Sequence, residues 1–238
     1  MKILVINPVG TDRWDRGDQE YLSRQAPPTD VIDVLSLSDG PLSVETPVAE
    51  ARAERGVLEL VGRVGSEYDS IMVNCFAEPG VMASREIVDV PVVGPCQASL
   101  AVASQLGERF CIVSPRSDHG NMVLRRARVL GFEARIAASE GIGIPVLDLD
   151  AHKETTVRAI AEAARRGLDR GADVVILGCT GMACVIDEVR KALPVPVVEP
   201  MAAGFAVARA LAGLKLRTSR QGLYIKAPLS KQTGGHAQ

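Results

Sequence analysis

The chain has 238 residues, of which 47% are hydrophobic, 24% charged and 3% aromatic, and its formal net charge is −2. This length can bury one large core or two lobes of roughly 100 residues each. The charge balance lacks the basic excess of a general nucleic-acid-binding protein. The composition is also unlike that of disordered, collagenous or disulfide-stabilised chains.

The sequence also bears on location. No stretch has the roughly 20 mainly apolar residues of a membrane-spanning helix, and the apolar run near the N-terminus is too short for a signal peptide. The five cysteines do not form the dense framework of a secreted domain. We therefore expect a cytoplasmic protein whose partner is a small molecule, not a nucleic acid or a membrane.

The first half of the chain alternates short apolar runs with helical stretches. The runs that predict buried parallel strands are Ile3–Ile6, Val31–Leu35, Ile71–Val73 and Pro91–Val93. A helical stretch, Glu50–Val64, lies between the second and third runs. Alternation of strands and helices with short turns predicts a parallel sheet with helices on its faces.

The second half repeats the pattern of the first. Three pairs of segments match in the same order, at offsets of 104 to 107 residues. They are Ile3–Pro8 with Phe110–Pro115, Asp69–Cys75 with Asp173–Cys179, and Pro91–Leu106 with Pro196–Leu211. The second copy also has its own amphipathic helical stretch, Glu154–Leu168. A nearly constant offset indicates two copies of one α/β unit.

The repeat predicts an α/β fold of two similar Rossmann-like lobes. Their parallel sheets would be related by a pseudo-twofold axis, with the active site between them. Residues 1–95 plus 210–238 would form the first lobe and residues 96–209 the second. Beyond the second copy, Gly222–Ala227 is strand-like and Lys231–Gln238 is a polar tail that we expect to be loose.

One cysteine follows a predicted strand at the same place in each copy, Cys75 and Cys179. Ligands of open parallel sheets bind outside the carboxyl ends of the strands. If the lobes face each other, the two thiols approach one cleft from opposite sides. One thiolate can then remove an acidic C–H proton while the other thiol returns a proton to the opposite face. Backbone N–H groups after each cysteine would stabilise the enolate oxygen.

The other cysteines are expected to be structural. Cys111 lies inside a strand and Cys184 inside a helix-like run, so we expect both in the core. Cys96 follows a strand near the expected mouth of the cleft. We expect it in the core too, and whether it reaches the site stays open.

The histidines and glycines bear on three other kinds of site: a Cys–His hydrolase site, a zinc site and a nucleotide-binding site. His119 lies in a loop from which it could reach the cleft as the base of a Cys–His hydrolase, whereas His152 and His236 are expected in solvent. The chain has no cysteine or histidine spacing typical of a zinc site. It also has no glycine-rich phosphate-binding motif. We therefore expect neither a metal nor a nucleotide cofactor.

At the repeat and its cysteines the chain resembles the aspartate/glutamate racemase superfamily, and within it the hydantoin (allantoin) racemase branch. The matching pieces are Lys2–Pro8, Cys75–Gly80, Pro91–Gly94 and Ile176–Met182. The resemblance implies two α/β lobes with the active site between them and racemisation without a cofactor. It also implies that Cys75 and Cys179 are the paired acid and base. Family members often associate, so a homo-oligomer is expected.

Departures from the family pattern bear on the substrate. Val9-Gly10 follows Asn7-Pro8 where hydantoin racemases carry a polar side chain, and Phe76-Ala77 and Gly181 replace polar residues of the amino-acid racemases. These differences favour a neutral five-membered ring over a free α-carboxylate. The residues expected to bind it are Asn7, Pro8, Phe76, Ala77, Ser114, Thr180 and Gly181. Glu78 is either a helix-start cap or a ligand.

The resulting hypothesis is a cofactor-independent racemase of 5-substituted hydantoins or related cyclic ureides. One alternative is an Asp/Glu-type amino-acid racemase, and another is a maleate isomerase-like enzyme of the same superfamily. Arylmalonate decarboxylases keep only the second cysteine of the pair, so the presence of both argues against that activity. A non-catalytic small-molecule binding protein is the alternative from a different class.

Overall fold

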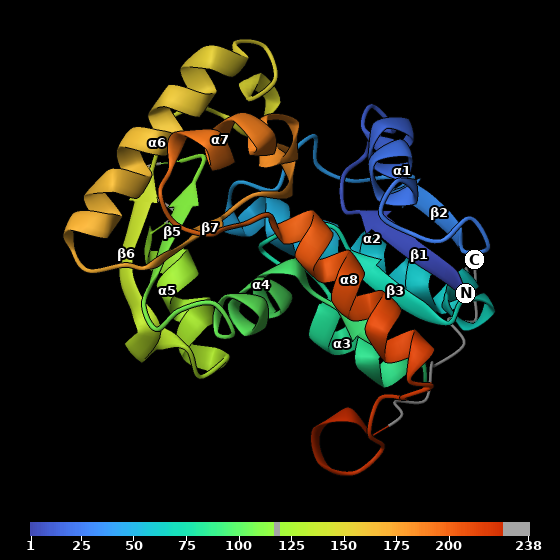
Figure 1. Cartoon of the computed structure of the whole chain (residues 1–238). Helices are drawn as coiled ribbons and strands as arrows, with labels where there is room; N and C mark the ends of the chain where they lie inside the picture. The colour runs from blue at the N-terminus through green and yellow to red at the C-terminus, as the bar shows by residue number, and fades with distance from the viewer. Residues whose placement is uncertain (117–119, 226–238) are drawn as a thin grey trace.

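The computed structural model describes residues 1–116 and 120–225, whose helices and strands form two lobes (Figure 1). Within these residues each lobe has a four-stranded parallel sheet, in the order β2-β1-β3-β4 or β6-β5-β7-β8. The strands are β1 Lys2–Asn7, β2 Val31–Ser36, β3 Ser70–Val73, β4 Val92–Val93, β5 Phe110–Ser114, β6 Ile136–Gly141, β7 Val174–Leu177 and β8 Val197–Val198. The shared strand order confirms the prediction of two similar α/β lobes.

Alternation along β1 divides the core of the first lobe into two layers, because successive side chains of a strand point to opposite faces. Leu4 and Ile6 belong to the layer under α2 (Pro47–Val64) and α3 (Val81–Ile87). Ile3 and Val5 belong to the other layer, under α1 (Asp15–Ser23) and α8 (Pro200–Gly213). Helices on both faces explain why the central strands β1 and β3 are buried along almost their whole length.

The second lobe is built in the same way around β5. Cys111 and Val113 face α6 (Lys153–Asp169) and α7 (Ile186–Ala192). Phe110 and Ile112 face α4 (Pro95–Ala103) and α5 (Gly120–Val129). The apolar stripe predicted within residues 154–168 is the buried face of α6, which confirms that helix.

The last helix of each repeat packs on the sheet of the other lobe. Helix α4 follows β4 but contacts β7 and β8, and α8 follows β8 but contacts β3 and β4. The two helices also pack against each other between the lobes (Figure 1). The sequence-based division assigns residues 200–209 to the second lobe, but these residues belong to α8, which packs on the sheet of the first lobe. The division of the chain at residues 96 and 210 itself stays a prediction.

One cysteine prediction is wrong. Cys111 and Cys96 are buried as expected, but Cys184 is exposed. Its segment, Thr180–Val185, forms a 3₁₀ helix in which Met182 and Val185 take the buried positions. Cys184 is left on the outer side of this turn.

The C-terminal region is described only in part. Gly222–Tyr224 is a 3₁₀ turn rather than the start of the predicted strand. The rest of that predicted strand and the polar tail 231–238 lie outside the described residues.

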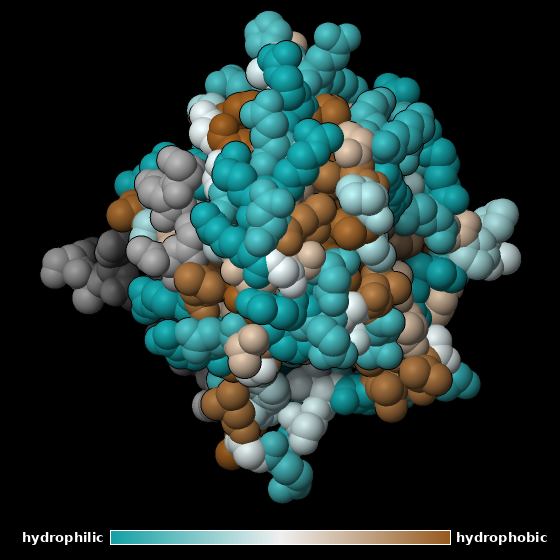
Figure 2. All heavy atoms as spheres, turned by 60° about the vertical axis from the view of Figure 1, so that its left-hand side comes forward, coloured by the Kyte–Doolittle hydropathy of each residue, from teal (hydrophilic) through white to brown (hydrophobic). Residues whose placement is uncertain are grey.

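Two features of the described residues bear on the expected location and oligomeric state. Within the described ranges no helix is both long and apolar enough to cross a membrane. The face in Figure 2 is mostly hydrophilic, and its hydrophobic residues form several small separate groups. Homo-oligomerisation and a cytoplasmic location stay predictions.

Candidate active site

The carboxyl ends of β3, β5 and β7 border a cavity between the two lobes. Its volume is about 410 Å³, within the range of small-molecule sites. The first lobe contributes the start of α2 and the loop after β3. The second lobe contributes α5 and the ends of β5 and β7. A ligand held there would contact both lobes.

Cys75 and Cys179 both line this cavity, and both side chains are half-buried. Each cysteine begins an equivalent turn. The N–H of Glu78 donates to the Cys75 carbonyl at 2.9 Å, and the N–H of Met182 donates to the Cys179 carbonyl at 3.1 Å. The sequence repeat therefore brings two thiols into one cavity from different lobes, each at the start of the same kind of turn.

Burial raises the pKa of both thiols above the ordinary value. At Cys75, the backbone N–H of Ala77 and the charge of Arg126 act in the opposite direction. At Cys179, a negative charge on Cys75 raises the pKa further, whereas the N–H of Gly181 lowers it. Because one thiolate disfavours the other, the pair titrates as a unit and passes through a state with one thiol and one thiolate. An acid/base pair requires this state.

A buried hydrogen bond joins the lobes beside the thiols. The Thr180 hydroxyl donates to the Asn74 carbonyl at 3.1 Å. Thr180 directly follows Cys179 and Asn74 directly precedes Cys75. This bond therefore limits how far the two cysteine turns can separate.

The end of β5 contributes Ser114 to the cavity lining. The Ser114 Oγ is buried and has no hydrogen-bond partner among the described residues. Gly178 makes room for it, because a Cβ at that position would lie 2.5 Å from the Ser114 Oγ. A buried hydroxyl without a partner is costly, and a bound ligand or water would satisfy it.

Asn7 and Pro8, predicted to bind the substrate, are not among the residues that line the cavity. The Asn7 amide donates to Asp15 at 2.8 Å and to Asp18 at 3.0 Å, and its oxygen accepts from Asn74 at 2.9 Å. Burial raises the pKa of Asp18 to about 6, although the amide of Asn7 opposes the shift. Asn7 thus belongs to a buried polar cluster behind the Cys75 turn, and its contact with a ligand stays a prediction.

The remaining predicted residues are spread around the site. Phe76 and Ala77 line the cavity, and Phe76 also packs into the core of the second lobe. Gly181 does not line it but adjoins Cys179, since a Cβ there would lie 3.5 Å from the sulfur. Cys96 is buried in the core of the second lobe, and His119 lies outside the described residues.

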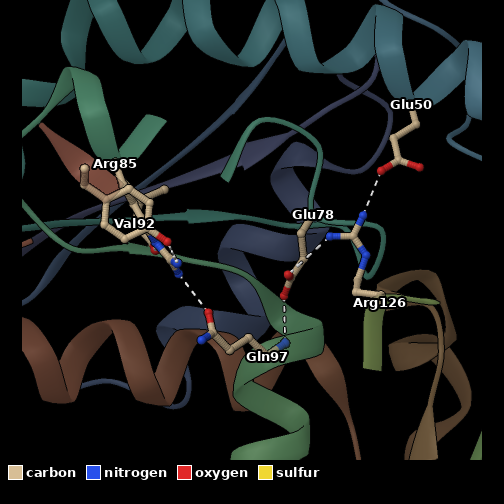
Figure 3. Close-up of polar contacts among 7 residues, drawn as sticks. Glu50, Glu78, Arg85, Val92, Gln97 and Arg126 are labelled. Atoms are coloured by element: carbon tan, nitrogen blue, oxygen red, sulfur yellow. Dashed lines mark hydrogen bonds and ion pairs between the residues drawn. The ribbon is translucent and has the colours of Figure 1, made fainter. Parts of the chain in front are cut away.

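Sequence reasoning missed an ion-pair bridge across the cleft. Arg126 on α5 donates to Glu50 on α2 at 2.7 Å and to Glu78 in the Cys75 loop at 3.4 Å (Figure 3). Arg126 and Glu50 line the cavity. The adjacent pair Arg125-Arg126, on the helix that follows β5, is a signal that the charge pattern offered. Missed apolar residues of the lining include Val44, Met82, Met122, Val129 and Val146.

Known proteins are similar to this chain in sequence and in fold. The family model for Asp/Glu/hydantoin racemase matches residues 3–208. A hydantoin racemase from Pseudomonas sp. (strain NS671) is 30% identical over 237 residues, covering 99% of this chain and 95% of that protein.

Two solved structures are similar over nearly the whole chain. Allantoin racemase from Klebsiella pneumoniae has a TM-score of 0.90 at 29% identity, covering 99% of this chain and 97% of that one. Allantoin racemase from Pseudomonas fluorescens has a TM-score of 0.92 at 28% identity, covering 98% of this chain and all of that one.

Proposed function

The chain belongs to the Asp/Glu/hydantoin racemase family and is a racemase, and from that premise we propose that it inverts the C5 stereocentre of 5-substituted hydantoins or related cyclic ureides. The observation that carries the proposal is the pair Cys75 and Cys179, which line one cavity from different lobes. Similar proteins named hydantoin racemase and allantoin racemase support this substrate class.

In the proposed reaction the thiolate of one cysteine takes the C5 proton, and the C–H electron pair moves onto the neighbouring ring carbonyl to form an enolate. The thiol of the other cysteine then delivers its proton to the opposite face of C5. The product is the mirror-image ring, and thiol and thiolate have changed places. Substrates of opposite hand therefore use the two cysteines in opposite roles. The scheme requires no cofactor.

Formation of the enolate requires a donor near the carbonyl oxygen, because a thiolate alone is a weak base for such a carbon acid. We assign this role to Ser114, a residue of the cavity lining whose buried hydroxyl lies beside Gly178 and has no partner among the described residues. The N–H groups of Ala77 and Gly181 face the two sulfur atoms and stabilise whichever of them is the thiolate.

A free amino acid would require charged partners for its carboxylate and ammonium groups. Two arginines line the cavity: Arg126 is already paired with Glu50 and Glu78, and Arg125 is exposed to solvent. Much of the remaining lining is apolar, including Phe76. A neutral ring with a substituent at C5 is therefore the better match to this cavity.

The test is proton NMR of the purified protein in D₂O, with polarimetry in parallel. The panel contains optically pure 5-substituted hydantoins, allantoin, aspartate and glutamate, and the Cys75→Ser/Cys179→Ser double variant is the control. We expect loss of the C5 proton signal and of optical rotation with the cyclic ureides alone. Racemisation of aspartate or glutamate alone would contradict the substrate class, and racemisation by the double variant would contradict the mechanism.

A further inference from the structure

The two halves of the site differ in how their last helices are capped. Glu199 caps the N-terminus of α8, and its carboxylate accepts from the N–H groups of Met201 and Ala202, both at 2.7 Å. The equivalent residue of the first repeat is Gly94, which has no side chain to cap α4. Helix N-termini favour negative charge, so this position requires a substitute.

Glu78 supplies that substitute from the Cys75 loop. Its carboxylate accepts from the N–H of Gln97 at 2.7 Å, in the first turn of α4 (Figure 3). A side chain at Gly94 would collide with the carboxyl group of Glu78. Glu78 is buried and has a φ of 54°, a region that residues other than glycine rarely adopt. The loop is therefore held in a strained conformation by its contacts.

Arg126 completes this arrangement from the other lobe. Its guanidinium bridges the Glu78 carboxylate and Glu50, so α5 is joined both to α2 and to the loop that begins at Cys75 (Figure 3). The residue after Cys179 that corresponds to Glu78 is Met182, which carries no charge. The bridge exists on the Cys75 side of the cavity and has no counterpart at that position beside Cys179.

We propose that Arg126 is a positioning residue specific to Cys75: by bridging Glu50 and Glu78 across the cleft, it fixes the Cys75 turn and places a positive charge on that side of the cavity. This rests on the proposed function of the same site and adds that the two thiols are not equivalent.

Several charged groups face this part of the site. Cys75 interacts electrostatically with Arg126 from α5 and Glu50 from α2, and it is coupled to Cys179. Glu78 is influenced by Arg126 and Arg85, and its charge also acts on buried Cys96. Arg126 favours the Cys75 thiolate and Glu50 opposes it, so changes at these two residues have opposite expected signs.

The readout has to separate the two thiols. Because two enantiomers have equal free energies, kcat/KM for racemisation is the same in both directions for any variant. The rate of alkylation by iodoacetamide reports on each thiolate separately when it is followed by mass spectrometry of the cysteine peptides. Exposed Cys184 serves as an internal standard.

The experiment compares Arg126→Gln, Glu50→Gln and Arg128→Gln with the unmodified protein across a pH series. Arg128 lies on the same helix, pairs with Glu133 and does not line the cavity, so it is the matched control. We expect Arg126→Gln to slow alkylation of Cys75 at a fixed pH by about three- to tenfold, with less than about twofold change at Cys179. Glu50→Gln should accelerate alkylation of Cys75, and Arg128→Gln should change neither thiol.

Equal effects of Arg126→Gln on both thiols would overturn the proposal, because they would indicate general opening of the cleft. An unchanged Cys75 would also overturn it. If Arg126→Gln does not fold, Glu50→Gln decides: faster alkylation of Cys75 supports the proposal, and unchanged or slower alkylation overturns it. These outcomes do not depend on turnover, so absence of hydantoin racemisation would remove the proposed function without deciding whether Arg126 acts on Cys75.

Discussion

The Thr180 hydroxyl donates a buried 3.1 Å hydrogen bond to the Asn74 carbonyl, and this bond connects the residues next to the two thiols across the lobes. Opposite-face proton transfer requires both sulfur atoms to stay within reach of one carbon. Small displacements of reacting groups have large effects on rate. The distance between the cysteine turns therefore depends on this interlobe hydrogen bond.

Replacing Thr180 with valine removes this bond at nearly constant volume. We expect Thr180→Val to lower the free energy of unfolding by about 1–2 kcal/mol and to reduce kcat by at least about tenfold. Thr156→Val is the control, since the Thr156 hydroxyl is also buried but donates to the Leu149 carbonyl at 3.0 Å within the second lobe. Equal losses of activity in the two variants would show that the interlobe bond has no special role.

Ser114→Ala tests the proposed enolate donor. Because the hydroxyl is buried and lacks a partner among the described residues, its removal should leave the melting temperature unchanged or raise it. Racemisation kcat/KM should fall by about 10²-fold, as for loss of an oxyanion donor. Ser99→Ala removes another such hydroxyl, outside the cavity lining, and should leave the activity unchanged. A less stable, fully active Ser114→Ala protein would contradict the assignment.

The pH dependence of turnover follows from the buried thiols. Burial raises the pKa of Cys75 and of Cys179, so the thiolate fraction is small at neutral pH and grows as pH rises. We expect kcat/KM, which reports on the free enzyme, to rise through neutral pH and to keep rising beyond the ordinary thiol pKa of about 8.5. A plateau reached below pH 8 would contradict this account.

Asp18 makes stability depend on pH in the opposite sense to a salt-bridged carboxylate. Its pKa is raised to about 6 in the folded protein, mainly by burial, whereas the ordinary value is about 3.9. The folded state therefore binds this proton more tightly than the unfolded state. The resulting stability is fully present below about pH 4 and is lost as pH rises through about 6.

We expect Asp18→Asn to reduce the pH dependence of the free energy of unfolding between pH 4 and 7. At pH 7 the substitution should raise the free energy of unfolding by about 1 kcal/mol. Asn7 and Asn74 donate to the same carboxylate oxygen of Asp18, at 3.0 and 3.2 Å, so the asparagine oxygen can accept both hydrogen bonds. The gain is limited because bonds to a neutral acceptor are weaker than bonds to a carboxylate. Urea denaturation at several pH values measures the effect, with exposed Glu162→Gln as a control. Equal destabilisation by Asp18→Asn at every pH would show that the carboxylate is required for its hydrogen bonds alone.

The repeat made much of the fold predictable. Matching segments at a nearly constant offset imply equal strand positions, and each half places a cysteine at the end of its third strand. Because ligands bind at this edge of parallel sheets, Cys75 and Cys179 were expected at one cleft. Both line the same cavity.

Other features depend on three-dimensional packing that a local pattern does not contain. The contact of Arg126 with Glu50 and Glu78 depends on how the lobes face each other, and on its helix Arg126 resembles its neighbour Arg125. Asn7 follows the expected strand, but the docking of α1 supplies the carboxylates that engage its amide. Cys184 is exposed because its segment winds as a 3₁₀ helix, which shifts the buried face.

The most direct test of the two-thiol mechanism is C5 hydrogen–deuterium exchange in D₂O by Cys75→Ser and Cys179→Ser, each with both pure enantiomers of one hydantoin. Each variant keeps one thiol base, so we expect loss of racemisation together with exchange that retains configuration. The two variants should exchange opposite enantiomers. Exchange of the same enantiomer by both variants, or racemisation by either at the rate of the unmodified protein, would contradict the mechanism.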